Sequence, residues 1–450
     1  MSRSDFWDDE ASKSTAFIEM KSRNEMKKRV VVTGLGVVAP NGVGLLDFKD
    51  AIKAGKSGIE YYEELKGLNF SCCIGGTPSV SNDMKLQYLT DLQLRNFSSS
   101  GIMYGCMAGI DAWRDAGLTF STEEPQWDSG CIFGTGVSSV QKMADASNLI
   151  DQGKIRRLGS NTASQTMASG VSAYLNSIIG FGNQVTTNSS ACTTGAESIL
   201  MGFDRIVAGH TEKVLVGSCS DDGKYIWGAF DAMKVMSYKH NDNPTQGSRP
   251  MSGSASGFVP GSGAGAMVLE TLESALARGA KIYAEVMGGH VNSGGQRGGG
   301  SMTAPNPLAI QKCIIEAIHS SGVSASDIDV INGHLTATIK DPEEVKNWAI
   351  ALGRSGDNFP YIHSLKSMVG HCIGAAGSIE SVGAVLGLYE DFIFPSINCE
   401  DLHPDIEHVI HRSRIPRTVI EHTNTKVVAK ASFGFGDVNC CVIYKKYENE

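Results

Sequence analysis

The sequence predicts an α/β fold, and three observations support this prediction. Short β-branched runs bounded by glycine alternate with longer stretches of helical apolar spacing. This alternation passes twice through a similar order of elements along the 450 residues. The composition, with 52 glycines and 7% aromatic residues, is typical of a compact enzyme with many tight turns. Together these observations indicate two similar halves built around a mostly parallel sheet.

The first half begins at Arg29, where "RVVVTGLGVVAPNG" predicts a buried strand followed by a turn. Residues 1–28 are polar and lack periodicity, so we expect a weakly ordered N-terminal extension there. Glycine-bounded runs and amphipathic stretches then alternate up to residue 272. They predict strands at residues 130–139, 213–220 and 263–270, and helices at residues 101–117 and 197–209.

The second half, residues 273–450, repeats this order. Each half contains a glycine-marked turn before a long helix of small residues, and in the second half we expect that helix at residues 374–390. The other expected elements are helices at residues 309–322 and 341–353 and strands at residues 281–291, 328–334, 427–436 and 439–446.

Charge, hydropathy and cysteine usage exclude several function classes. The formal charge of -9 argues against nucleic acid as the main partner, because phosphate binding requires a basic face. No apolar run reaches the roughly 18 residues of a membrane helix, and the N-terminus is too polar and acidic for a signal peptide. The 11 cysteines lack the paired spacing of a disulfide framework. We therefore expect a soluble, cytoplasmic protein.

Cys192 lies in "TNSSACTTGAES", a stretch with little side-chain bulk around the sulfur. The amphipathic run that follows places this cysteine at the N-terminus of a helix. The helix dipole and free N–H groups there favour a thiolate, which is the nucleophilic form of cysteine. Free cysteines are also among the most often buried residues. The stretch alone leaves two interpretations open, an inert core thiol and a nucleophile.

Two histidines of the second half occupy similar positions between a predicted strand and a loop. His334 lies in "NGHLTAT", and His371 follows Lys366 in "LKSMVGHCIGAAGS". Loops at the carboxyl ends of strands open into the clefts of α/β sheets. Either histidine alone is typical of a structural residue. The two together with a helix-start cysteine indicate nucleophilic chemistry.

An ordered set of motifs spans the chain from about Arg29 to Lys446. They are "VVVTGLGVVAPNG", "ACTTG", "NDNPTQGSRP", "GFVPGSGAGAMVLE", "GHLTAT", "KSMVGHCIGAAGSIE" and "SFGFGDVN". With them the sequence resembles the β-ketoacyl-acyl carrier protein synthases of the thiolase superfamily, most nearly the type II elongating class. The resemblance implies a thiolase-like fold, with two similar halves in a five-layered αβαβα arrangement. It also implies an acyltransferase of fatty acid biosynthesis or of a related polyketide or polyene pathway.

The resemblance assigns catalytic roles residue by residue. Cys192 matches the acyl-accepting nucleophile, and His334 and His371 match the pair that serves malonyl decarboxylation and condensation. Lys366 matches the active-site lysine of the family, and Glu380 matches its usual partner. A buried structural ion pair between these two residues is the other interpretation, and both can hold together.

Further residues are expected to contact the substrate. Phe435 matches the aromatic residue that gates the acyl pocket, and its backbone N–H would join that of Cys192 in an oxyanion hole. The remaining substrate residues expected are Thr336 and Thr338, which match the threonines that contact the phosphopantetheine arm, and Phe230 and Thr303.

The chemistry accounts for these residue types. Acyl transfer between two thioesters is nearly thermoneutral, so it requires a reactive thiolate and donors for the tetrahedral oxyanion more than a strong base. Loss of CO₂ from a malonyl group leaves an enolate, whose oxygen two neutral imidazole N–H groups can stabilise. A nearby lysine keeps the field positive and disfavours protonated histidines.

The sequence departs from the family pattern at three places. Leu335 stands where the family usually has glycine, and we expect it to press on the loop of His334 and narrow the pantetheine channel. Asp437 replaces the last glycine of "GFGG" and is expected to add a negative charge beside the gate. The stretch "GSCSDD" at residues 217–222 differs from the Gly/Ala-rich sequence of the family.

The expected partner is an acyl carrier protein loaded with acyl or malonyl groups on 4'-phosphopantetheine, with no bound cofactor and no metal. Carrier proteins are acidic, so binding requires a local basic patch. Candidates for this patch are Lys154, Arg156, Arg157 and Lys234, which are equally typical of a solvated helix edge. The resemblance implies a homodimer, with neither nucleic acid nor membrane as partner.

The resulting prediction is a 3-oxoacyl-[acyl-carrier-protein] synthase. One alternative is the catalytic subunit of a heterodimer with a chain-length factor. The chain-length factor itself lacks the nucleophile, whereas Cys192 is present here. A thiolase or acyltransferase would require a second cysteine in a C-terminal glycine-rich loop. Cys440 is close to that position, but "SFGFGDVN" is the synthase pattern.

Overall fold

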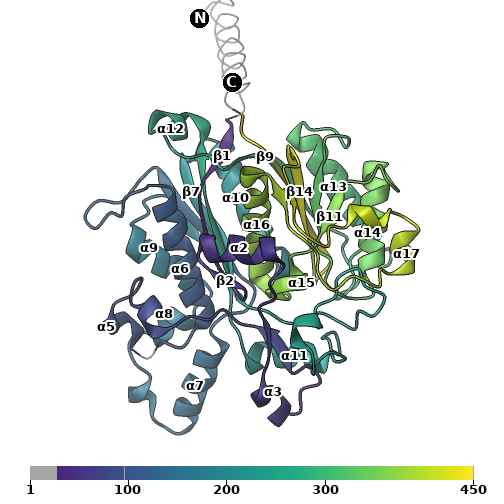
Figure 1. Ribbon diagram of the computed structural model, residues 1–450. Coiled ribbons are helices and arrows are strands. Elements are labelled where there is room, and N and C mark those ends of the chain that lie inside the picture. The colour runs from purple at the N-terminus through teal and green to yellow at the C-terminus, as the bar shows by residue number, and fades with distance from the viewer. Residues whose placement is uncertain (1–27, 96, 449–450) are drawn as a thin grey trace, which may run out of the picture.

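The computed structural model describes residues 28–95 and 97–448 and is drawn in Figure 1. The predicted N-terminal extension therefore lies outside the described residues, apart from Lys28. The centre of the described part is one sheet of 11 strands, folded around two central helices. All 11 cysteines are buried without disulfide bonds. No helix within the two described ranges has both the length and the apolar character that crossing a membrane requires.

The sheet consists of two halves with the same strand order. The N-terminal half runs β6-β5-β7-β8-β1 and the C-terminal half runs β11-β10-β14-β15-β9, with β1 paired to β9 where the halves meet. In chain order, each half is arranged third, second, fourth, fifth and first. The ten strands of this order are β1 (Val30–Ala39), β5 (Ser129–Thr135), β6 (Val185–Thr186), β7 (Lys213–Ser220), β8 (Gly263–Thr271), β9 (Ala284–Ser293), β10 (Val330–Asn332), β11 (Tyr361–His363), β14 (Val427–Gly434) and β15 (Val438–Lys445). The eleventh strand, β2 (Gly42–Val43), pairs with β1.

The sheet is mixed, so the prediction of a mostly parallel sheet is wrong. In the N-terminal half β5 pairs parallel with β6 and β7, while β7–β8 and β1–β8 are antiparallel. The C-terminal half repeats these directions. A parallel neighbour requires a crossover, whereas a short turn makes the next strand antiparallel. Residues 435–437 alone join β14 to β15, whereas the antiparallel strands β7 and β8 are joined by the long connection at residues 221–262, and the alternation of elements does not reveal the direction of such a pair.

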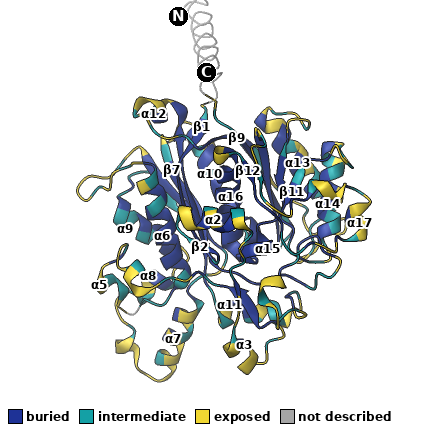
Figure 2. Ribbon diagram, in the orientation of Figure 1, coloured by how far each residue is buried: buried dark blue, intermediate teal, exposed yellow. Residues whose placement is uncertain are grey.

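Helices form three layers around the two layers of sheet. Helices α10 (Thr194–Val207) and α16 (Ala376–Glu390) pack against each other between the sheet halves, and α16 is almost wholly buried while α10 is mostly buried (Figure 2). Helices α6 (Ser100–Asp115) and α9 (Gly170–Ile179) cover the outer face of the N-terminal half. Helix α13 (Pro307–Ser321) covers the C-terminal half, with α14 (Asp341–Leu352) packed on it. This is the predicted αβαβα arrangement.

Glycine sets how closely the two central helices approach. A Cβ on Gly195 of α10 would collide with the backbone nitrogen of Ser378 in α16. A Cβ on Gly377 of α16 would lie 2.6 Å from the backbone nitrogen of Ala196 in α10. The two helices thus meet backbone to backbone near their N-terminal ends, which brings the segments that precede them together.

The remaining elements lie around this centre. They are α2 (Leu45–Ala54), β3 (Ile59–Tyr61), α3 (Glu63–Gly67), β4 (Ile74–Gly76), α4 (Asn82–Lys85), α5 (Asp91–Leu94), α7 (Val140–Asp151), η1 (Ile155–Arg157), α8 (Thr162–Thr166), η2 (Ala191–Thr193), α11 (Lys224–Ala232), η3 (Pro244–Gln246), α12 (Leu272–Ala277), α15 (Lys366–Val369), η4 (Ile373–Ala375), β12 (Phe392–Ile393), α17 (Pro404–Glu407), η5 (Arg412–Arg414) and β13 (Ile420–Glu421).

Candidate active site

Cys192 lies in the single 3₁₀ turn η2, one turn before helix α10. Ala191, which precedes it, has a left-handed φ of 50°, and this backbone turn directs the cysteine toward the C-terminal half. The side chain is 8% exposed. The sequence correctly predicted a helix-start cysteine, although the turn is 3₁₀ rather than the first turn of the α-helix.

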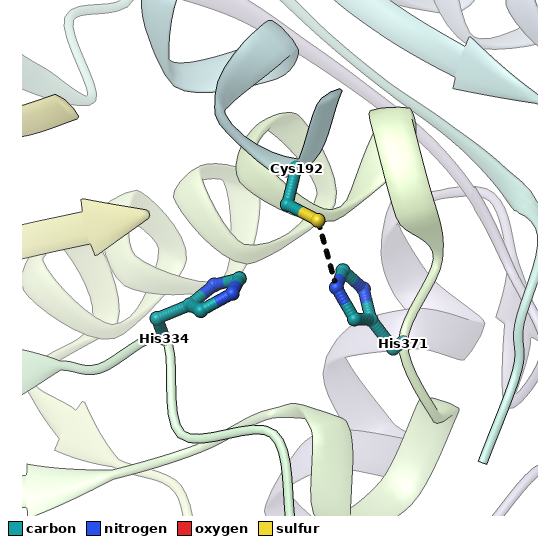
Figure 3. A group of neighbouring side chains, drawn as sticks. All are labelled: Cys192, His334 and His371. Atoms are coloured by element: carbon teal, nitrogen blue, oxygen red, sulfur yellow. Dashed lines mark hydrogen bonds between the residues drawn. The ribbon is translucent and has the colours of Figure 1, made fainter. Parts of the chain in front are cut away.

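His371 contacts this thiol, with its Nε2 atom 3.2 Å from Cys192 Sγ (Figure 3). The other ring nitrogen, Nδ1, accepts the backbone N–H of Ile373 at 3.1 Å. A neutral imidazole carries one proton, so this contact places the proton on Nε2. His371 therefore presents an N–H donor to the sulfur.

His334 faces the same space from the loop after β10. Its ring lies 5.4 Å from the His371 ring, centre to centre, at an angle of 85°. One atom from each of Cys192, His334 and His371 falls within 4.8 Å of the others. Sulfur and imidazole nitrogen in this spacing also form a chemically suitable set of zinc ligands. The structure thus brings together the three predicted catalytic residues from both halves.

Burial controls the protonation of these three groups. It lowers the pKa of His334 and of His371 well below the usual value, and the nearby positive charge of Lys366 lowers both further. Both rings are therefore neutral at pH 7, as predicted. Burial also raises the pKa of the Cys192 thiol to about 11, against the opposing effects of the Phe435 backbone N–H and of Lys366.

Burial therefore opposes the thiolate form that the helix-start position of Cys192 favours. The backbone N–H groups of Phe435 and of Cys192 itself do lower the thiol pKa, as predicted for a helix-start site. Their effect is smaller than the cost of placing a charge in a buried site. Cys192 is a neutral thiol until a substrate arrives.

A buried charge cluster lies next to the histidines. Lys366 of α15 forms an ion pair with Glu380 of α16, as predicted. Lys430 of β14, which the sequence analysis missed, lies with its Nζ 2.8 Å from Glu380 Oε2 and is fully buried. Two cations thus share one carboxylate. The available signal was a lysine inside the otherwise apolar strand "VVAKASFG".

Two carboxylates at the start of α14 hold the His334 loop, and the sequence analysis missed both. Glu344 accepts the backbone N–H groups of His334 and Leu335, each at 2.7 Å. Asp341 accepts that of Thr336 at 2.9 Å. Burial raises the pKa of Glu344 to about 7 and that of Asp341 to about 6. The signal was the acidic "DPEE" at the predicted helix start.

Leu335 does not have the predicted role. Its side chain is fully buried in the hydrophobic core of the C-terminal half and is not among the described residues that line the cavity. Its φ of 21° turns the backbone between His334 and Thr336. Glu344 and the Ser364 hydroxyl hold this turn, so the leucine packs inward and leaves the channel unobstructed.

A cavity of about 260 Å³ opens in front of Cys192. Ile339 in its lining is 89% exposed, so the cavity reaches the surface. The Thr336 and Thr338 hydroxyls lie 3.0 Å apart in its wall. The predicted residues that line it are Cys192, Phe230, Thr303, His334, Thr336, Thr338, His371 and Phe435, and those the sequence analysis missed include Val235, Phe258, Ile310, Ile339, Lys340 and Ile373.

The four predicted basic residues lie elsewhere. Lys154, Arg156 and Arg157 are exposed in and beside η1, which contacts α7, and α7 contacts α11. Lys234 is exposed just after α11. Their binding role stays a prediction. Lys340, by contrast, lines the cavity itself.

Two family models match most of the chain. The β-ketoacyl synthase N-terminal domain matches residues 27–275, and the β-ketoacyl synthase C-terminal domain matches residues 283–400. The 3-oxoacyl-[acyl-carrier-protein] synthase 1 of Haemophilus influenzae is 32% identical over 421 residues, which cover 93% of this chain and 99% of that protein.

Solved structures show the same architecture. A type II polyketide synthase acyl-carrier protein in complex with its ketosynthase, bound to the hexaketide, matches with a TM-score of 0.82 and 27% identity, over 94% of this chain and 100% of that one. The ishigamide ketosynthase/chain length factor matches with a TM-score of 0.83 and 26% identity over the same shares.

Proposed function

This chain belongs to the β-ketoacyl synthase family, and from that premise we propose that it is a 3-oxoacyl-[acyl-carrier-protein] synthase with Cys192 as its nucleophile. It joins an acyl group on Cys192 to malonyl-acyl carrier protein and yields 3-oxoacyl-carrier protein, CO₂ and the free thiol. The observation that carries this proposal is the convergence of Cys192 with two neutral histidines at one cavity.

The first half-reaction is acyl transfer to Cys192. As the sulfur attacks the thioester carbonyl, the new C–S bond forms and the carrier's C–S bond breaks, and the thiol proton passes to the departing pantetheine sulfur. The N–H on His371 Nε2, 3.2 Å from Sγ, stabilises the charge that develops on the sulfur. The backbone N–H groups of Cys192 and Phe435 hold the tetrahedral oxyanion.

The second half-reaction is condensation. Once Cys192 is acylated, the Nε2–H of His371 no longer donates to a free thiol. It can then donate, together with His334, to the malonyl thioester oxygen. The bond to the carboxylate breaks, CO₂ leaves, and the electron pair forms an enolate on that oxygen. The enolate carbon attacks the acyl carbonyl, and the Cys192 sulfur leaves and regains a proton.

Lys366, Glu380 and Lys430 set the electrostatics of this step. The net positive charge of these three groups opposes protonation of the histidines and favours the developing enolate. Lys366 and Lys430 are not among the described residues that line the cavity, so they act through the field rather than by contact with the substrate.

The substrate arrives on the phosphopantetheine arm of an acyl carrier protein. The cavity supports this proposal because it leads from the surface to Cys192 and carries hydroxyls at Thr336 and Thr338 that suit amide groups of the arm. Lys340 at its rim and the predicted basic residues Lys154, Arg156, Arg157 and Lys234 would meet the acidic carrier.

The family resemblance supports a homodimer. A heterodimer with a chain-length factor is the second candidate, because the ishigamide ketosynthase/chain length factor matches this chain over nearly its whole length. Purification of the chain alone separates the two. A stable dimer that elongates acyl chains without any other subunit supports the homodimer, and activity that requires a co-purified second subunit supports the heterodimer.

Intact-protein mass spectrometry tests the proposed function directly. The protein is exposed to a panel of acyl-carrier proteins, and we expect a mass increase equal to one acyl group, located on the peptide that contains Cys192. Cys313→Ala serves as a matched control, because Cys313 is also a buried free cysteine but lies outside the site. It should acylate normally. An adduct on another residue contradicts the proposal.

A further inference from the structure

We propose that the Asp437 carboxylate latches the turn that carries Phe435 to the loop at residues 294–306, and that this latch selects the acyl chains that reach Cys192. The selection part of this proposal rests on the proposed function of Phe435 as a gate. The latch itself rests on contacts of described residues.

Four hydrogen bonds join the two segments. The Asp437 carboxylate accepts the backbone N–H of Gln296 at 2.9 Å with Oδ2 and that of Asn306 at 2.8 Å with Oδ1. The Asp437 carbonyl accepts the N–H of Gly294 at 3.1 Å, and the N–H of Gly436 donates to the Met302 carbonyl at 2.8 Å. The carboxylate thus spans both ends of the 294–306 loop.

The loop is shaped around this carboxylate. Asp437 is fully buried. A Cβ on Gly294 or on Gly300 would collide with its Oδ2 atom, so both glycines leave room for the oxygen. The last residue of the loop, Asn306, is also the N-cap of α13 and accepts the N–H of Leu308 at 2.9 Å. Through Asn306 the latch is fixed to the covering helix of the C-terminal half.

Both latched segments line the cavity. Phe435 borders it from the turn between β14 and β15, and Thr303 and Pro305 border it from the 294–306 loop. A displacement of the turn that moves Asp437 away from the loop must break hydrogen bonds to a buried carboxylate, which are stronger than neutral ones, whereas a rotation of the Phe435 side chain alone breaks none. A displacement that carries the loop along keeps them. The structure therefore favours a coupled movement of the two walls.

Aspartate at position 437 contacts the 294–306 loop, whereas glycine would leave the turn more flexible and without these contacts. Asp437 has a left-handed φ of 62°, which glycine adopts freely and which aspartate and asparagine tolerate. Glycine would fit the turn but leave the N–H groups of Gln296 and Asn306 without this acceptor. Asparagine keeps the backbone shape but has one acceptor oxygen where the aspartate has two. The two substitutions therefore separate the backbone from the carboxylate.

Hydrogen–deuterium exchange of the full-length protein tests the latch, with Asp437→Asn and Asp437→Gly compared with the unmodified chain. We expect exchange at residues 294–306 to be about tenfold faster in both variants, as the loss of a charge-assisted hydrogen bond implies. Asp329→Asn is the matched control, because Asp329 also accepts two backbone N–H groups, from Lys426 and Val427, away from the cavity. It should leave exchange at residues 294–306 unchanged. Unchanged exchange in both Asp437 variants overturns the latch.

Rates of Cys192 acylation by short and long acyl-carrier proteins test the selection. We expect both Asp437 variants to change the ratio of the long-chain to the short-chain rate by about threefold or more, whereas Asp329→Asn keeps the ratio. Faster exchange with an unchanged ratio overturns the selection. If the unmodified protein is not acylated by any carrier, the proposed function fails, and the exchange measurement still decides the latch.

Discussion

Helices α10 and α16 begin in the same way, yet only the turn before α10 has a cysteine as its second residue. Each follows a single 3₁₀ turn whose first residue is left-handed, Ala191 with φ 50° and Ile373 with φ 49°. The second residue of the turn is Cys192 in one half and Gly374 in the other. At Gly374 a Cβ would lie 2.5 Å from the backbone nitrogen of Gly136, so this start has no room for a side chain.

The difference teaches how a duplicated fold divides its chemistry. In the proposed reaction, the N-terminal half supplies the sulfur atom that forms the covalent bond. The C-terminal half supplies the groups that control charge, because His371 and Lys366 precede its central helix and His334 follows its second strand. One backbone geometry thus serves two roles, and each role can be removed separately.

The sharpest test of this division is the thiol itself. Cys192→Ala should abolish acylation and condensation, since no other described group occupies the position of Sγ. Cys192→Gln should also abolish acylation but retain malonyl decarboxylation, because its uncharged amide can stand in for the acylated sulfur. The two half-reactions are measured by acyl-enzyme mass and by CO₂ release. Acyl-enzyme in either variant would contradict the role of Cys192.

The histidines test the other side of the division. His334→Ala and His371→Ala should each lower decarboxylation by about 10²- to 10³-fold, the usual cost of one oxyanion donor. Acyl transfer should fall less, and less for His334 than for His371, because His371 contacts the sulfur. Acyl-enzyme mass and CO₂ release again measure the two half-reactions. Equal loss of acyl transfer in both variants would mean that the histidines mainly hold the Cys192 site together.

Leu335 should affect stability and leave selectivity unchanged. Because its side chain is fully buried in the C-terminal core, Leu335→Ala should lower the free energy of unfolding by about 2–5 kcal/mol. Chemical denaturation measures this loss. The ratio of long-chain to short-chain acylation should stay as in the unmodified protein. A changed ratio would restore the interpretation of Leu335 as an obstacle in the channel.

Lys430 should shift a pH profile. Its charge lowers the pKa of His371, so Lys430→Met should raise that pKa. Protonation would set His371 Nδ1–H against the N–H of Ile373, so decarboxylation should be lost as the pH falls through the His371 pKa. The acid limb should therefore move to higher pH in Lys430→Met.

The control for this profile is Lys445→Met, because Lys445 is an exposed lysine on the neighbouring strand β15. Its acid limb should coincide with that of the unmodified protein. An acid limb that does not move in Lys430→Met would show that burial and the field of Lys366 keep His371 neutral without Lys430.

Much of this fold follows from the sequence because periodicity reports which residues face the core. The predicted strands at residues 213–220 and 263–270 match β7 and β8 closely, and the helix at residues 101–117 matches α6. Periodicity does not give strand direction, and β7 and β8, for example, pair antiparallel across the long connection at residues 221–262. That is why the mixed sheet was predicted as mostly parallel.

The site was predictable where a motif fixes a residue and unpredictable where a tertiary neighbour decides its state. Cys192, His334 and His371 were found from their motifs. The thiol's protonation was not, because burial outweighs the backbone N–H groups around it. In the sequence Lys430 looks like an ordinary strand residue, and only the structure shows Glu380 beside it. The role of Leu335 likewise depends on which way the turn directs its side chain.

The hydrogen bond from the Ile373 amide to His371 has a consequence for how this enzyme can change. The proton on Nε2 is placed by a main-chain group, and every residue except proline supplies that group. The side chain of residue 373 lines the cavity. Substitutions there can therefore remodel the space for the acyl chain while the imidazole keeps its tautomer. At this position, adaptation to a new substrate is uncoupled from proton chemistry.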